Sequence, residues 1–274
     1  MEENRRLDHG AGRLIGRMMR GIARFKGESM VTLLDDSESA GSGLRGIYKV
    51  GGISVLLAVL VALAEIAITF LPGAAHMPVT VIDWFVLFQD NWLLGLRNFG
   101  LLNLIGAFLL TPTFLALYFA LRHENEPWPA LGAILFFMGM AVYLASYKGF
   151  AMLSLSSQYA SALTDAQRSV VAAAGQAMLV EGSNRFGLFL IDLAGVVISA
   201  VMLRGKVFGN AAAYAGILGN GLMMVFEAVQ AFVPAWRSSG LIVAICAGIS
   251  IMVWWVLVGR RLLRLERADD RAAG

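Results

Sequence analysis

Long apolar runs, separated by shorter polar stretches, make up most of the chain from residue 50 onward. A helix rises about 1.5 Å per residue, so a run of about 20 apolar residues crosses the roughly 30 Å of hydrocarbon in a bilayer. Six runs meet this length, and the pattern predicts an all-α, polytopic membrane helix bundle with six transmembrane helices. Their approximate bounds are Val50–Leu71, Phe99–Leu121, Ala130–Leu153, Phe186–Leu203, Val207–Phe232 and Gly240–Gly259.

A further apolar stretch, Val81–Leu96, differs from these runs because it carries Asp83 and Asp90. As a helix it would extend only about 24 Å, which is short of a span. It also contains Trp84 and Trp92, and tryptophan favours the headgroup level of a membrane. We therefore expect an interfacial segment here, not a seventh span.

The longest polar connection, Ser154–Arg185, joins the third and fourth runs. Thr164 or Asp165 is a suitable N-cap for a helix that runs to about Val180 and carries apolar residues on one face. This pattern predicts that the connection folds back over the bundle as a lid or a packed cover.

The fifth run contains small residues at four-residue spacing, namely Ala212, Gly216 and Asn220, with Ala215 and Gly219 beside them. Such spacing allows helix backbones to approach closely. We expect a packing seam within the bundle, and a seam between copies of the chain is the alternative.

Composition agrees with a membrane protein, since 58% of the residues are hydrophobic and the mean hydropathy is +0.70. The net charge of +3 arises from arginines in loops and near the ends of the chain, so no nucleic-acid partner is expected. The single cysteine, Cys246, lies in an apolar run and excludes both an intramolecular disulfide and a CxxC site.

Lysine and arginine are distributed unequally between the two sides of the predicted membrane. Seventeen of the 22 would lie on the side that holds both ends of the chain, and five on the other side. Basic residues accumulate on the cytoplasmic side, so we expect both termini to be cytoplasmic. The expected partners are the lipid bilayer and, at the cytoplasmic face, anionic headgroups.

The segment before the first run has two interpretations. Apolar residues repeat at helical spacing opposite arginines between Arg13 and Phe25, which predicts a basic amphipathic helix on an anionic membrane surface. Alternatively, translation starts at Met30, because Lys26–Ser29 back-translates to a purine-rich run resembling a bacterial ribosome-binding site. The later start would leave ten basic residues against five, so the expected orientation is the same. The expected organisation is a cytoplasmic N-terminal segment at 1–46, a membrane domain at 47–265 and a cytoplasmic tail at 266–274.

Four ionisable residues fall within the predicted spans, in runs one, three, four and five: Glu65, Lys148, Asp192 and Glu227. All four are predicted about 8 to 9 Å below the non-cytoplasmic boundary. A charge facing lipid is costly, so these residues are expected to face the bundle interior or to reach the surface. Three carboxylates and one ammonium do not pair completely, and a cation, a proton or a ligand amine would balance the surplus. One interpretation is a site for a small solute or cation. The other is a structural Lys148–Asp192 ion pair, with Glu65 and Glu227 reaching water.

Enzymatic motifs are absent from the sequence, including HExxH, GxSxG, GxGD, DDxxD and GxxxxGK. The three histidines, His9, His76 and His123, all lie outside the runs, which disfavours a bis-histidine haem or an intramembrane histidine–metal site. No cofactor and no catalytic residue is predicted, although a diacidic hydrolase stays open. The main alternatives are a binding or transport protein and a structural or partner-binding protein.

Three segments, Met152–Leu179, Met202–Asn220 and Val258–Leu265, resemble a bacterial membrane family known only as a domain of unknown function, number 4386. The resemblance covers roughly residues 44 to 265. It implies a six-helix protein of the bacterial inner membrane, and it implies no activity.

Overall fold

The computed structural model describes residues 46–68, 78–124, 127–179, 183–233 and 240–273, and every element within these ranges is a helix. Among them are six helices that are long and apolar enough to cross a membrane, as predicted. The proposed N-terminal amphipathic helix and the alternative start at Met30 lie outside the described residues. The spanning helices are a first span at Gly46–Ile68, α4 at Leu101–Leu121, α5 at Pro127–Ala145, α8 at Ser183–Arg204, α9 at Asn210–Phe232 and α10 at Leu241–Ala273.

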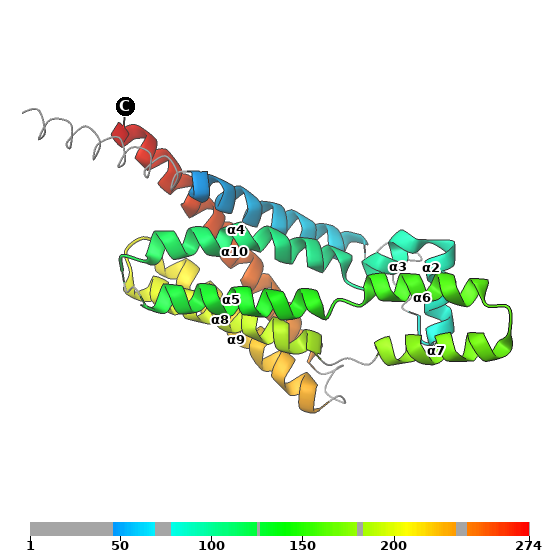
Figure 1. The fold of residues 1–274 in the computed structure, drawn as a ribbon. Helices are drawn as coiled ribbons and strands as arrows, with labels where there is room; N and C mark the ends of the chain where they lie inside the picture. The colour runs from blue at the N-terminus through cyan, green and yellow to red at the C-terminus, as the bar shows by residue number, and fades with distance from the viewer. Residues whose placement is uncertain (1–45, 69–77, 125–126, 180–182, 234–239, 274) are drawn as a thin grey trace, which may run out of the picture. The chain divides into compact units, whose positions relative to one another are not determined.

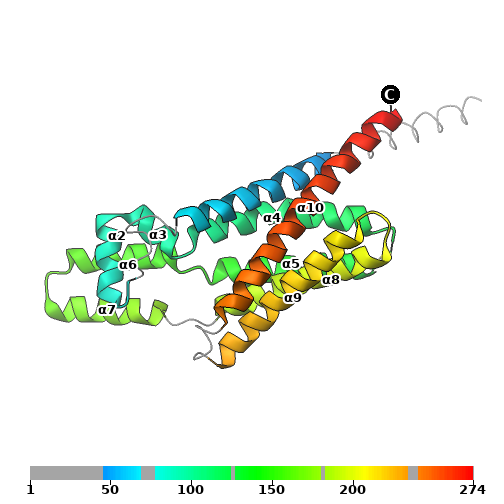
Figure 2. The same ribbon diagram turned by 180° about the vertical axis from the view of Figure 1, so that it is seen from behind.

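Each spanning helix packs against the next in the order first span, α4, α5, α8, α9 and α10 (Figures 1 and 2). The first span contacts both α4 and α10, so it joins the beginning of this series of helices to its end. A Cβ added at Gly51 would lie 2.5 Å from Cβ of Ala116 in α4, and one added at Gly52 would lie 2.9 Å from Leu263 in α10. The hydroxyl of Thr113 in α4 also donates a 2.9 Å hydrogen bond to the Gly51 carbonyl. The first and last spanning helices of the described residues therefore belong to one bundle.

Small residues bring the central helices together. A Cβ at Gly139 of α5 would lie 2.8 Å from the carbonyl oxygen of Gly187 in α8, so only glycine permits this approach. The predicted seam of the fifth run is present within the bundle. Gly216 lies against Ser199 of α8 and Trp254 of α10.

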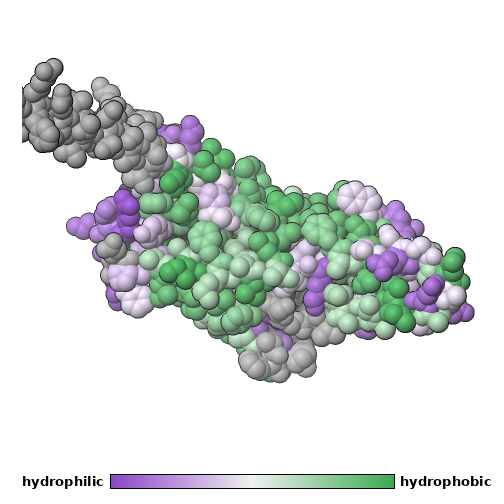
Figure 3. All heavy atoms as spheres, in the orientation of Figure 1, coloured by the Kyte–Doolittle hydropathy of each residue, from purple (hydrophilic) through white to green (hydrophobic). Residues whose placement is uncertain are grey.

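Large apolar side chains remain exposed on the outer faces of the spans, for example Leu60 at 60% and Ile249 at 59%. Figure 3 shows this apolar surface over the bundle, with polar residues gathered toward its two ends. An apolar surface of this extent suits lipid as the surrounding solvent.

Beyond one end of the bundle lie four shorter helices, which we call the cap (Figure 1). They have their own apolar core, which includes Trp84, Phe85, Phe88 and Met152. The four helices are α2 at Val81–Asp90, α3 at Trp92–Asn98, α6 at Gly149–Ser161 and α7 at Asp165–Leu179.

The stretch predicted to be interfacial forms α2 and α3, and neither is a candidate span. The break falls at Asn91, whose side-chain oxygen accepts a 3.0 Å hydrogen bond from the Leu94 amide and so begins α3. Trp84 is buried in the cap core, whereas Trp92 is 56% exposed.

The connection after the third run differs from the expectation. Helix α5 ends at Ala145, and α6 begins at Gly149, inside the predicted third run. The connection then packs against α2 as part of the cap, since the Ser156 hydroxyl donates a 2.8 Å hydrogen bond to the Phe85 carbonyl. Thr164 is confirmed as the N-cap residue of the next helix, α7, because its hydroxyl accepts a 3.2 Å hydrogen bond from the Gln167 amide.

Candidate functional site

A cavity of about 400 Å³ lies at the end of the bundle that adjoins the cap. All six spanning helices and the α3–α4 turn contribute to its wall. The turn includes Gly100, whose φ of +90° is a conformation that glycine adopts without strain. The volume is within the range of small-molecule sites, about 300 to 1,000 Å³.

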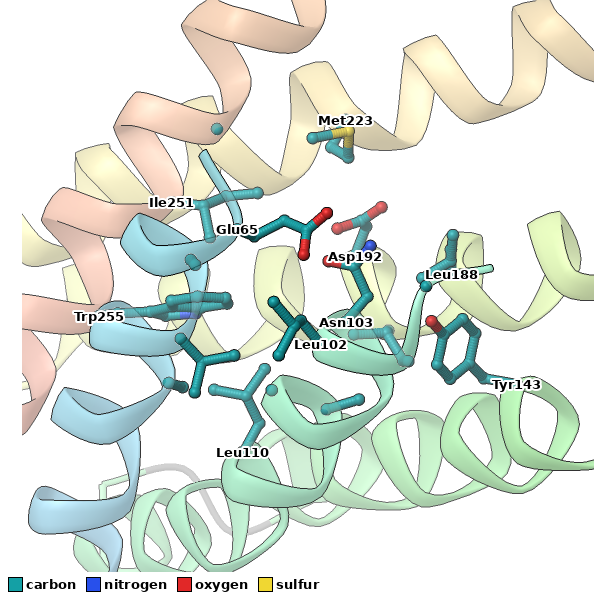
Figure 4. Close-up of a pocket in the computed structure, with 18 of the residues that line it drawn as sticks. Glu65, Leu102, Asn103, Leu110, Tyr143, Leu188, Asp192, Met223, Ile251 and Trp255 are labelled. Atoms are coloured by element: carbon teal, nitrogen blue, oxygen red, sulfur yellow. The ribbon is translucent and has the colours of Figure 1, made fainter. Parts of the chain in front are cut away.

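Most of the wall is apolar, and the polar groups on it come from five different spans. Figure 4 shows the carboxylates of Glu65 and Asp192 extending toward one another from opposite sides, with the Asn103 side chain close by. Three of the four predicted residues, Glu65, Asp192 and Glu227, therefore line one cavity. The polar residues of the wall are Glu65, Asn103, Tyr143, Asp192 and Glu227.

Glu65, in the first span, is paired with Arg97 from the end of α3. The Arg97 guanidinium lies 3.3 Å from the Glu65 carboxylate and donates a 3.1 Å hydrogen bond to the Glu65 main-chain carbonyl. A second nitrogen of Arg97 donates a 2.9 Å hydrogen bond to the Asn98 side chain. The Arg97 side chain is only 8% exposed, so a cation from the cap is buried beside the cavity.

Glu227, in α9, is paired with Arg185 from the first turn of α8. The guanidinium donates a 2.9 Å hydrogen bond to the carboxylate, and the two side chains are 19% and 9% exposed. Because Arg185 lies seven residues before Asp192, the two occupy the same face of α8.

Asp192 differs from the other two carboxylates. It is 7% exposed, and within the described part of the chain no hydrogen bond or ion pair reaches its carboxylate. Glu227 lies near enough to interact with it electrostatically, with the same sign of charge. An ionised carboxylate in this position is costly unless a cation or a proton neutralises it.

Lys148 lies elsewhere. It occupies the N-cap position of α6, is half-buried, and does not line the cavity. The ion pair expected between Lys148 and Asp192 is not among those of the described residues, which instead join Arg97 to Glu65 and Arg185 to Glu227. The end of α5 at Ala145 explains the difference, because it moves Lys148 from a spanning helix into the junction with the cap.

Sequence reasoning missed the two arginines and the polar side chains of Asn103 and Tyr143. A signal existed for Arg185, since its seven-residue distance from Asp192 places both on one helix face. For Arg97 the signal was its position as the single lysine or arginine between Val50 and Leu121, at the end of an apolar stretch.

The donors around the cavity do not resemble a metal centre, since the described residues contain no group of three or more His, Cys, Asp or Glu placed to hold a metal ion. The arrangement suits a small organic molecule with a positive charge better than a multiply ligated ion. Searches of protein-family models, of curated proteins and of solved structures found no match to this chain.

Proposed function

We propose that this protein binds a small solute in the cavity beside the cap, and that it is a solute-binding or solute-moving membrane protein. The observation that carries the proposal is the convergence of Glu65, Asp192 and Glu227, from three helices, on one cavity of about 400 Å³. A cavity of this size with a few convergent polar groups is the usual form of a small-molecule site.

The structural alternative, in which the buried charges only hold helices together, has support of its own. The Glu65–Arg97 and Glu227–Arg185 pairs are close and mostly buried. Asp192 favours the solute-binding function, because it is buried and faces the cavity without a hydrogen bond or ion pair from the described residues.

We further propose that the protein lies in a bacterial inner membrane with both termini in the cytoplasm, which places the cap and the cavity on the outer side. The distribution of lysine and arginine supports this orientation. The resemblance in Met152–Leu179 and two shorter segments supports membership of the six-helix family.

Cavity-filling variants test the proposed function. A Cβ at Gly106 or Gly248 would meet no atom within 4 Å, and both residues line the cavity. Leucine at either position should therefore occupy the cavity without a clash in the bundle. Gly221 is a matched control, since it is equally open and does not line the cavity.

The measurement is the melting temperature of purified protein with three solutes of similar size: benzylammonium, benzyl alcohol and benzoate. Binding to the folded state raises the melting temperature by mass action. We expect at least one solute to do so for the wild type and for Gly221→Leu, and not for Gly106→Leu or Gly248→Leu. Absence of any shift in the wild type, or an equal shift in the filled variants, would overturn the proposed function.

A further inference from the structure

We propose that the solute is a monovalent organic cation, an ammonium with an apolar body, and that Asp192 is its counter-charge. This inference rests on the proposed function and specifies the chemical class of the ligand.

The balance of carboxylates and arginines around the cavity indicates the charge of the ligand. Two of the three carboxylates, Glu65 and Glu227, each have an arginine within ion-pair distance, at 3.3 Å and 2.9 Å. Asp192 has no such partner among the described residues, and Lys148 does not line the cavity. When Asp192 is ionised, its negative charge faces the cavity without a counter-charge from the described residues, so a single positive charge on a ligand balances it.

The burial of Asp192 gives the position of that positive charge. The side chain extends into the cavity, and the residue is 7% exposed (Figure 4). Water alone stabilises so buried a carboxylate poorly, whereas a ligand cation restores the electrostatic interaction lost on burial. The Asn103 side chain beside it offers a further polar contact for a ligand.

The composition of the wall decides between an organic and an inorganic cation. Hard metal ions require about six to eight oxygen ligands gathered around one point. The described residues contain no group of three or more His, Cys, Asp or Glu placed to hold a metal ion, and most of the wall is leucine, isoleucine, methionine, glycine and alanine. Tyr143 and Trp255 lie on opposite sides of the cavity. Aromatic rings attract cations through their faces and pack against apolar groups, so this wall suits an alkyl- or aryl-ammonium.

The probe for the experiment is benzyltrimethylammonium, whose positive charge is independent of pH. Its dissociation constant is measured by calorimetry on purified wild-type protein and on Asp192→Asn, Asp192→Glu and Asp165→Asn. We expect Asp192→Asn to weaken binding at least about tenfold and Asp192→Glu to retain it, because the charge is kept. Asp165, whose side chain is fully exposed on α7, is the control and should have no effect.

Each other outcome has a separate meaning. Binding to Asp192→Asn as tight as to wild type would overturn the assignment of Asp192. Displacement of the probe by equimolar Na⁺ or K⁺ would identify an inorganic cation site and overturn the organic class. Should Asp192→Asn fail to fold, the displacement test on wild type decides, together with the solute panel. Preference for benzyl alcohol or benzoate would overturn the cation class while the proposed function stands, and no binding by any probe would overturn both.

Discussion

Arg97 contacts Glu65 through two different groups, its carboxylate at 3.3 Å and its main-chain carbonyl at 3.1 Å. One guanidinium therefore neutralises a membrane-depth carboxylate and joins the cap to the bundle.

Removal of this cation should be strongly destabilising. In Arg97→Met the Glu65 carboxylate loses a mostly buried partner, which typically costs about 3 to 5 kcal/mol in the free energy of unfolding. Replacement of both residues, Arg97→Met with Glu65→Leu, should recover part of the loss, and the lost bond to the carbonyl limits the recovery. Reversible unfolding in mixed micelles measures the free energy of unfolding of the single and the double variant.

The control is a second ion pair made by the first span, between Lys49 and Glu266 at 3.6 Å. The Lys49 side chain is 60% exposed, so Lys49→Met should cost less than about 1 kcal/mol. Equal effects of Arg97→Met and Lys49→Met would contradict a buried, structural role for Arg97.

The spanning helices could be predicted from the sequence because lipid imposes one simple requirement, a long apolar run in which the backbone bonds to itself. The six predicted runs each overlap a spanning helix. The convergence of Glu65, Asp192 and Glu227 was foreseeable on the same basis, since buried charge in a membrane faces the interior.

The partners of these residues could not be predicted in the same way. Arg97 approaches Glu65 from a cap helix, and this depends on the tertiary packing of α3 against the bundle, which no local pattern records. The end of α5 was missed because the residues on both sides of Ser146 are apolar enough to continue a span. The run therefore predicted one helix where the structure has two.

The packing of α7 against α2 within the cap provides a second prediction. A Cβ at Gly175 would lie 2.6 Å from both Phe85 and Val81 of α2. Gly175→Val should therefore push α7 away from α2 and increase amide exchange in α7, as measured by mass spectrometry. Ala173, exposed on the same helix, is the control, and Ala173→Val should leave the exchange unchanged. Unchanged exchange in Gly175→Val would show that α7 does not depend on this contact.

The capping box that begins α2 provides a prediction on pH. Hydrogen bonds from the Thr80 hydroxyl and the Thr80 amide hold the pKa of Asp83 below its ordinary value of 3.8. A lowered pKa in the folded state means that the stabilisation is complete above the ordinary value and is lost as the pH falls through the lowered one.

The free energy of unfolding should thus differ between wild type and Asp83→Asn at neutral pH, and the difference should vanish as the pH falls below the lowered pKa of Asp83. Chemical unfolding of both proteins at a series of pH values measures this difference, in which the other titrating groups cancel. A difference that persists unchanged into strong acid would show that the charge of Asp83 contributes nothing.

Labelling of single cysteines tests the proposed orientation. The natural Cys246 is exposed, so it is first replaced in Cys246→Ala. In that background Ser157→Cys introduces a thiol on the exposed surface of α6 in the cap, and His123→Cys introduces one in the exposed turn after α4, at the opposite end of the bundle. If the cap is outside, an impermeant maleimide added to intact cells should label position 157 and not position 123. After permeabilisation both positions should react, which confirms that each thiol is accessible. The reverse pattern in intact cells would place the cap and the cavity in the cytoplasm, and the solute would then be bound from that side.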